Sequence, residues 1–233
     1  MSASHDDEAF VKEVLRINDR FTQEVVEAFD ICPFARGARI QGRAIREVVL
    51  HAEPDLEPSL AVIDRLERDP RRLEVVQVIY PRLVVTPKEF DHFNARLREA
   101  HAARTKSPVF VHATFHPDYG CDTRTPDALV MFFRRAPDPT IQLVRFSVIQ
   151  NVRKHEDRGT VVMDPSTFDW TKPPPPPPPT VPEKITRDNY DRVMKDGPEV
   201  IAGIYDSIRK DRDESYARFS GSPSPPRSPG QRP

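Results

Sequence analysis

Cysteine, glycine and net charge are all scarce in this sequence. Its 233 residues include two cysteines, Cys32 and Cys121, which lack the CxxC spacing of a zinc framework. Only eight glycines are present, and neither a Gly-rich phosphate loop nor a Ser-His-Asp signature appears. The formal net charge is -1, so no basic field favours nucleic acid or an anionic membrane surface as a partner.

Long apolar runs are missing as well. No window approaches the ~18 consecutive apolar residues that a membrane span requires. The first eight residues are acidic and polar, without the basic start and apolar run of a secretory signal. We therefore expect a cytoplasmic protein without membrane contact, in which both cysteines are reduced thiols.

Proline is abundant and unevenly distributed. Of the 26 prolines, 11 lie in residues 1–150 and 15 lie in the remaining 83 residues, seven of them in succession at 173–179. Such a tract forms a stiff polyproline II spacer that separates modules and offers a docking element to a protein partner. We predict four parts: an α/β domain at 8–165, a Pro-rich linker at 166–187, a C-terminal helix at 188–211 and a disordered tail at 212–233.

Helical and strand patterns alternate in the predicted domain. An apolar stripe from Phe10 to Phe29 recurs at steps of three and four, which indicates a core-facing helix beginning near Asp6. Thr86 and Glu89 form a capping box at the start of a later helix. In chain order, we predict strands at 44–50, 73–80 and 109–115 and helices at 58–69, 86–97 and 139–148.

This order predicts an α/β fold with a small, three- to four-stranded, largely parallel sheet flanked by helices and followed by a Pro-rich C-terminal extension. Ligands of such sheets lie beyond the carboxyl ends of the strands. His51, Tyr80 and His116 fall at that edge.

Cys32 follows the first helix in the sequence Cys-Pro-Phe-Ala. As the cap of a new helical turn it would be favoured as a thiolate, supported by Arg36 and Arg39, whereas at the end of the first helix it would not. The alternative is a small buried apolar residue that seals a helix end.

His116 follows the third strand in the sequence Phe-His-Pro-Asp-Tyr. Asp118 or Tyr119 could orient its imidazole as a general base, and the alternative is a histidine hydrogen-bonded at a strand end. His112 and His116 stand about 13 Å apart along a strand, so they cannot chelate one ion together. A mixed metal site of Cys32, His116 and a carboxylate stays open, but we assign no metal ligands, and the cofactor is unknown.

Arginines supply the candidate anion-binding groups. Arg135 precedes a proline-bounded turn, Arg145 ends the segment that begins there, and Arg36 lies close to Cys32 in the sequence. Guanidinium groups can bind a carboxylate or phosphate bidentately, although solvated surface charge is the commoner role of any single arginine.

Three ordered motifs together resemble an uncharacterised bacterial family, domain of unknown function 1415 (DUF1415), over roughly residues 8–150. They are the Cys32 motif, the His116 motif and the segment from Arg135 to Arg145. Cys32, His116, Tyr119, Arg135 and Arg145 match the family pattern. The chain departs from that pattern at 134–139, where Arg134, Ala136 and Asp138 replace asparagine, serine and an aromatic residue. The resemblance implies a shared pocket but no reaction.

Our leading hypothesis is a small-molecule enzyme with a Cys/His site at the carboxyl edge of the sheet. Cys32 would serve as nucleophile or redox thiol, His116 as base, and Asp118 and Tyr119 as orienting groups. Arg36, Arg135 and Arg145 would bind the anionic part of the ligand. One alternative is a metal- or ligand-binding protein without turnover that uses the same cysteine and histidine. The other is an interaction protein that acts through the Pro-rich tail.

Overall fold

The computed structural model describes most of the chain. It covers residues 5–29, 31–32, 35–70, 72–105, 109–120, 122–150 and 181–219. Cys121, the polyproline tract at 173–179, most of the predicted linker and the end of the predicted tail lie outside these residues. No helix in the described residues is long and apolar enough to cross a membrane.

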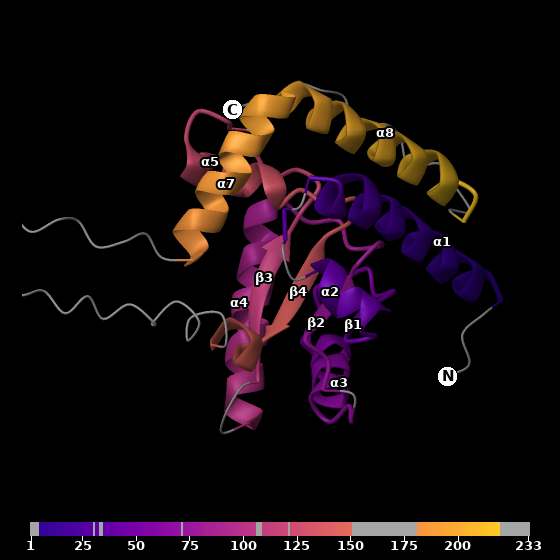
Figure 1. Cartoon of the computed structure of the whole chain (residues 1–233). Helices are drawn as coiled ribbons and strands as arrows, with labels where there is room; N and C mark the ends of the chain where they lie inside the picture. The colour runs from indigo at the N-terminus through magenta and orange to yellow at the C-terminus, as the bar shows by residue number, and fades with distance from the viewer. Residues whose placement is uncertain are drawn as a thin grey trace, which may run out of the picture.

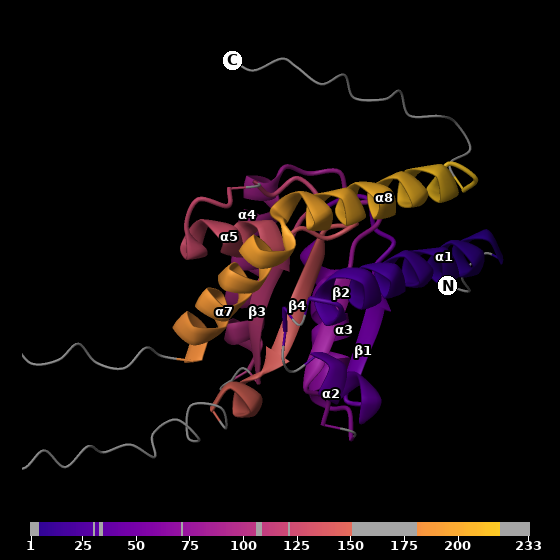
Figure 2. The ribbon, with the colours of Figure 1, turned by 45° about the horizontal axis from the view of Figure 1, so that its top comes forward.

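A four-stranded sheet forms the centre of the molecule (Figures 1 and 2). Its strands are β1 (Ala44–Val48), β2 (Val75–Ile79), β3 (Phe110–Phe115) and β4 (Thr140–Arg145), arranged in the order β1-β2-β4-β3. β1 pairs with β2 in parallel, and β4 pairs antiparallel with both β2 and β3. Strands β1, β2 and β3 therefore run in one direction, and β4 runs the opposite way between β2 and β3.

The prediction of a largely parallel sheet is wrong, because two of the three strand pairings are antiparallel. The α/β class and the flanking helices are confirmed. The error arises at 139–148, which we predicted to be a helix but which contains β4. Ile141, Val144 and Val148 stand three and four residues apart, as in a helix. Ile141 and Leu143, two residues apart, are both fully buried, as a strand with one core face requires.

Helices from both ends of the chain, together with one from its second half, pack on one side of the sheet. In chain order they are α1 (His5–Phe21), the π-helix η1 (Thr22–Glu27), α2 (Ala35–Ile40), α5 (Pro126–Phe133), α7 (Val181–Asp196) and α8 (Pro198–Tyr216). α8 lies beside α1, and α7 lies beside α5 (Figures 1 and 2). The predicted helix at 188–211 falls within α7 and α8, which are separated at Gly197, where φ is 91°.

The predicted apolar stripe of α1 is confirmed, since Phe10, Val14, Ile17 and Phe21 are all buried. Charged groups reinforce the packing of α1 against α8. Asp211 of α8 accepts hydrogen bonds from Arg16 at 2.7 Å and from Arg20 at 2.5 Å. Such partly exposed pairs contribute up to about 1 kcal/mol each, so the buried stripe is the larger contribution.

Two crossover helices cover the other face of the sheet. α3 (Leu56–Glu67) connects β1 to β2, and α4 (Pro87–Arg104) connects β2 to β3. Right-handed crossovers that progress in one direction place both helices on the same face. The capping box of α4 is confirmed: the Thr86 hydroxyl accepts from the Glu89 N–H, and the Thr86 N–H donates to the Glu89 carboxylate at 2.7 Å.

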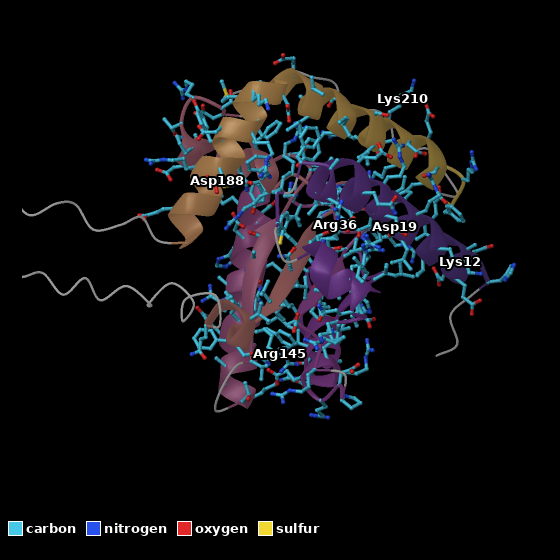
Figure 3. All side chains as sticks on the ribbon, in the orientation of Figure 1. Lys12, Asp19, Arg36, Arg145, Asp188 and Lys210 are labelled. Carbon is cyan, nitrogen blue, oxygen red and sulfur yellow. The ribbon has the colours of Figure 1, made fainter. Side chains whose placement is uncertain are left out.

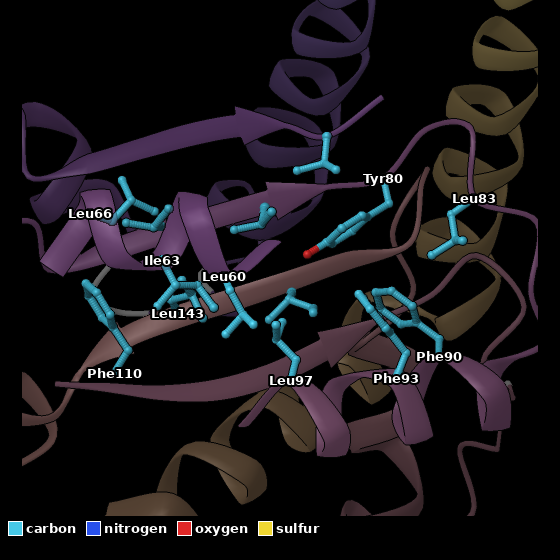
Figure 4. Close-up of a cluster of buried hydrophobic side chains, with 14 of the residues drawn as sticks. Leu60, Ile63, Leu66, Tyr80, Leu83, Phe90, Phe93, Leu97, Phe110 and Leu143 are labelled. Atoms are coloured by element: carbon cyan, nitrogen blue, oxygen red, sulfur yellow. The ribbon is translucent and has the colours of Figure 1, made fainter. Parts of the chain in front are cut away.

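The main apolar core lies between α3, α4 and the sheet. Leu60, Ile63 and Leu66 of α3 and Phe90, Phe93 and Leu97 of α4 belong to one cluster on the same face of the sheet, as Figure 4 shows. Val76 and Val78 of β2 and Ile141 and Leu143 of β4 contribute the sheet side of this core. The opposite face of the same strands is left for the candidate site.

A buried carboxylate anchors α8. Asp138, in the turn before β4, is 2% exposed and accepts hydrogen bonds from Arg212 at 2.9 Å and from the Tyr216 hydroxyl at 2.8 Å. Burial raises the pKa of Asp138, and the Arg212 guanidinium acts against this increase. Breaking such a pair leaves an uncompensated buried charge.

We predict that Arg212→Met lowers the free energy of unfolding by about 3 kcal/mol near neutral pH. Without Arg212 the pKa of Asp138 rises further, so the folded protein holds a proton more tightly than the unfolded chain. The contribution of Asp138 to the stability of this variant is then largest in acid and is lost as the pH rises through the raised pKa. The loss in the free energy of unfolding relative to the wild type should therefore be smaller at about pH 4.5 than at about pH 7.5, measured by urea unfolding.

Lys210→Met, an exposed change on the same helix, is the control and should cost less than about 0.5 kcal/mol. Equal deficits of Arg212→Met at both pH values would contradict the role of Asp138.

Candidate functional site: a cavity over the open face of the sheet

A cavity of about 600 Å³ lies on the face of the sheet opposite α3 and α4. Its floor is formed by β1, β2 and β4 with Phe115 at the end of β3, and its walls come from α1, η1, α2, α5 and α7. The apolar part of the lining includes Leu15, Phe21, Val26, Ile31, Val130 and Phe133. The cavity thus combines segments from both ends of the chain.

Two glutamines lie on the floor. Gln77 of β2 is directly opposite Gln142 of β4, and Arg46 of β1 is the next residue in the same transverse row. Because strand side chains alternate between faces, these three point away from the core that Val76 and Ile141 enter. Neither glutamine carboxamide has a hydrogen-bond partner among the described residues. The floor therefore offers two open carboxamides.

Most charges at the cavity are already paired. Arg46 lies 2.5 Å from Asp19, and Arg39 lies 2.6 Å from Glu27. The Arg39 guanidinium lowers the pKa of Glu27, whose side chain is only 7% exposed. Arg134, the cap residue at the end of α5, also lines the cavity but has no ion-pair or hydrogen-bond partner for its side chain within the described residues.

One wall of the cavity is a π-helix. In η1, the backbone N–H of Ala28 donates to the carbonyl of Gln23, five residues earlier, at 3.2 Å. π-helical turns are rare and often occur at functional sites. Thr22 begins this turn and lines the cavity. Its hydroxyl is buried, yet it has no hydrogen-bond partner among the described residues.

Cys32 is half-buried and lines the same cavity. Residues of α7 hold the preceding loop: Asn189 donates to the carbonyl of Ile31 at 3.0 Å, and Arg192 donates to the carbonyl of Phe29 at 2.8 Å. The position of Cys32 at the cavity therefore depends on a C-terminal helix.

His116 does not line the cavity. Its Nε2 lies 3.0 Å from the carbonyl of Val85, and its Nδ1 accepts from the backbone N–H of Asp118 at 3.1 Å. The ring packs against Phe90 in the α4 layer, and burial lowers its pKa, so it is neutral near pH 7. Both ring nitrogens are occupied by the backbone, and the structure does not bring His116 together with Cys32.

Asp118 and Tyr119 support the His116 turn in ways that the sequence did not indicate. Asp118 holds the imidazole through its backbone N–H, while its carboxylate lies 3.1 Å from Arg209. The Tyr119 hydroxyl is 2.5 Å from Asp91 rather than near the imidazole nitrogens. Burial, together with this hydrogen bond, raises the pKa of Tyr119 to about 12.

The three predicted anion-binding arginines are separated from one another. Arg135 stacks on Tyr205, with its guanidinium carbon 5.0 Å from the ring centroid, and its side chain is 14% exposed. Arg145 ends β4, where its Nε donates to the carbonyl of Leu73 at 2.7 Å. Arg36 of α2 is 66% exposed and lies 3.8 Å from Glu27. Figure 3 shows Arg145 at the far end of the sheet from Arg36. No joint clamp forms.

Sequence patterns did not indicate Gln77, Gln142 or Thr22, and Arg134 stood out only as a departure from a family pattern. A signal for the glutamines was present, because Gln77 interrupts an otherwise apolar strand and Gln142 stands between Ile141 and Leu143. Within the described residues, no group of three or more His, Cys, Asp and Glu side chains is placed to hold a metal ion.

Residues 13–164 match the model of a family described as a protein of unknown function, DUF1415. The chain therefore belongs to this family. No curated protein and no solved structure matches the chain. The match includes all four strands but ends before α7 and α8, so the helix that holds the Cys32 loop lies beyond it.

We predict that His116 does not influence the reactivity of Cys32. In a Cys121→Ser background, the pH profile of iodoacetamide alkylation should give the same apparent thiol pKa in the parent and in His116→Gln, because the imidazole is bonded to backbone outside the cavity. His92→Gln, at an exposed histidine of α4, is the matched control, and circular dichroism verifies folding. A thiol pKa that shifts by about one unit or more only in His116→Gln would contradict this prediction and support an interaction between Cys32 and His116.

Proposed function

We propose that the protein binds a small, largely apolar organic molecule in the cavity over the open face of the sheet. The observation that carries this proposal is the cavity itself, at about 600 Å³. Ligand pockets typically measure about 300–1,000 Å³ and combine apolar walls with a few polar groups that fix orientation. The open carboxamides of Gln77 and Gln142 are such groups.

A packing defect does not explain the cavity. At about 600 Å³ it is several times larger than an empty core cavity of ~150 Å³, and it is open to solvent. Its lining is mainly apolar, so a molecule with an apolar surface that replaces water there is stabilised by the hydrophobic effect.

Binding is the part of the sequence hypothesis that the geometry supports best. A Cys32 nucleophile with His116 as its base has no geometric support, because the backbone occupies both imidazole nitrogens. Asp118, Tyr119, Arg135 and Arg145 are engaged in contacts of their own. Cys32 alone remains at the cavity among the residues named for catalysis.

A second candidate is a thiol-dependent enzyme that acts on the bound molecule. It is favoured by one observation, the position of Cys32 in the cavity lining. The two candidates differ in turnover of 4-nitrophenyl acetate, a generic acyl donor. In a binding protein the Cys32 thiol accepts the acetyl group once and the ester releases at most one equivalent of 4-nitrophenolate. In a thiol enzyme water hydrolyses the acetyl thioester, so turnover continues, and Cys32→Ala abolishes it.

We predict that the protein binds 8-anilinonaphthalene-1-sulfonate, an apolar dye with one anionic group, at a single saturable site. Val130→Trp, which fills the cavity from α5, should weaken this binding at least about tenfold, because the indole occupies the space of the dye. Isothermal titration calorimetry gives both stoichiometry and affinity.

The matched control is Val84→Trp, at a side chain that is 73% exposed and does not line the cavity. This variant should bind the dye as the wild type does. Loss of binding in both variants, or in neither, would contradict the assignment of the cavity as the binding site.

A further inference from the structure

The polar groups at the cavity that lack protein partners define a chemical class of ligand. They include the guanidinium of Arg134 and the carboxamides of Gln77 and Gln142. The Thr22 hydroxyl also lacks a partner among the described residues, but it is buried, so it is not one of the groups open to the cavity. Unused hydrogen-bonding groups that line one space indicate a ligand with a polar end.

The charge of that end follows from the pairing around the cavity. Asp19 neutralises Arg46, and Glu27 neutralises Arg39. Arg134 has no counter-ion among the described residues, so one positive charge remains. Arg134 is at the C-terminus of α5, where the helix dipole favours a positive charge. This interaction forms no hydrogen bond, so the guanidinium N–H donors stay available.

Of the two consecutive arginines Arg134 and Arg135, only Arg134 lines the cavity. Arg135 stacks on Tyr205 and lies 4.0 Å from Asp206, and it is not part of the cavity lining. Two consecutive arginines therefore have different surroundings. Arg135 contributes to the packing of α8, whereas the charge of Arg134 is available to a bound molecule.

The geometry points to an organic acid as the ligand: an apolar body held by the cavity walls, with one carboxylate that binds Arg134. The inference rests on the proposed function, since it names the class of molecule for the same cavity. A guanidinium binds a carboxylate bidentately, and the carboxamide N–H donors of Gln77 and Gln142 can satisfy further oxygen lone pairs. A single unpaired guanidinium matches one negative charge, whereas a phosphate monoester carries nearly two.

The test uses three probes with the same apolar body: octanoate, octan-1-ol and octylammonium. Calorimetric titration of the full chain should give an affinity for octanoate at least about tenfold above that for octan-1-ol, with octylammonium weakest. In Arg134→Gln, the affinity for octanoate should fall at least about tenfold while that for octan-1-ol stays within about twofold. Arg134→Lys should retain part of the preference, because it keeps the charge but loses the bidentate geometry.

Arg124→Gln is the control, since the Arg124 side chain is 87% exposed, pairs with Asp122 and does not line the cavity. Equal affinity for octanoate and octan-1-ol, or octanoate binding that survives Arg134→Gln, would overturn the acid assignment and leave the binding function intact. If none of the three probes binds and the anilinonaphthalene dye also fails to bind, the proposed function is wrong and the acid assignment falls with it.

Discussion

The antiparallel pairing of β2 with β4, in which Gln77 lies directly opposite Gln142, determines both faces of the sheet. Strand side chains alternate strictly, so this register sends Val76 and Val78 into the core with α3 and α4 and sends both glutamines the other way. A slip of one residue would bury the carboxamides and expose the valines. The core and the floor of the cavity are therefore specified by the same hydrogen-bond ladder, and the stability of one maintains the geometry of the other.

The walls of the cavity depend on the end of the chain that the family match does not include. Asn189 and Arg192 of α7 hold the loop before Cys32, and α8 is fixed to the turn before β4 by the buried Asp138 carboxylate. That turn also connects α5, whose cap residue is Arg134, to β4. The anchoring of α8 and the placement of the unpaired guanidinium thus belong to one short segment, and the cavity is a joint product of the family domain and its C-terminal helices.

Local signals in the sequence predicted much of the fold. The stripe of α1, the capping box at Thr86 and Glu89 and the first three strands were readable because neighbouring residues determine them. β4 was misread because Ile141, Val144 and Val148 also fit helical spacing. For the site, the sequence indicated Cys32 but paired it with His116. In the turn after β3, the Asp118 N–H donates to Nδ1 of His116, so this nitrogen is not open to the Cys32 thiol. Only the folded structure shows this contact.

Gln77 and Gln142 carry information of a different kind. Val75 and Ile79 share a face with Gln77 and are both buried, so this face of β2 is not a polar one that merely contacts water. Apolar or β-branched residues would suit the centre of such a strand better than glutamine. Departures from the pattern that stability favours tend to occur at functional sites. Two such departures face each other across the central strand pair, in a cavity that also contains an unpaired guanidinium and a thiol. Their coincidence is difficult to explain by folding alone, and recognition of a ligand with a polar end accounts for it.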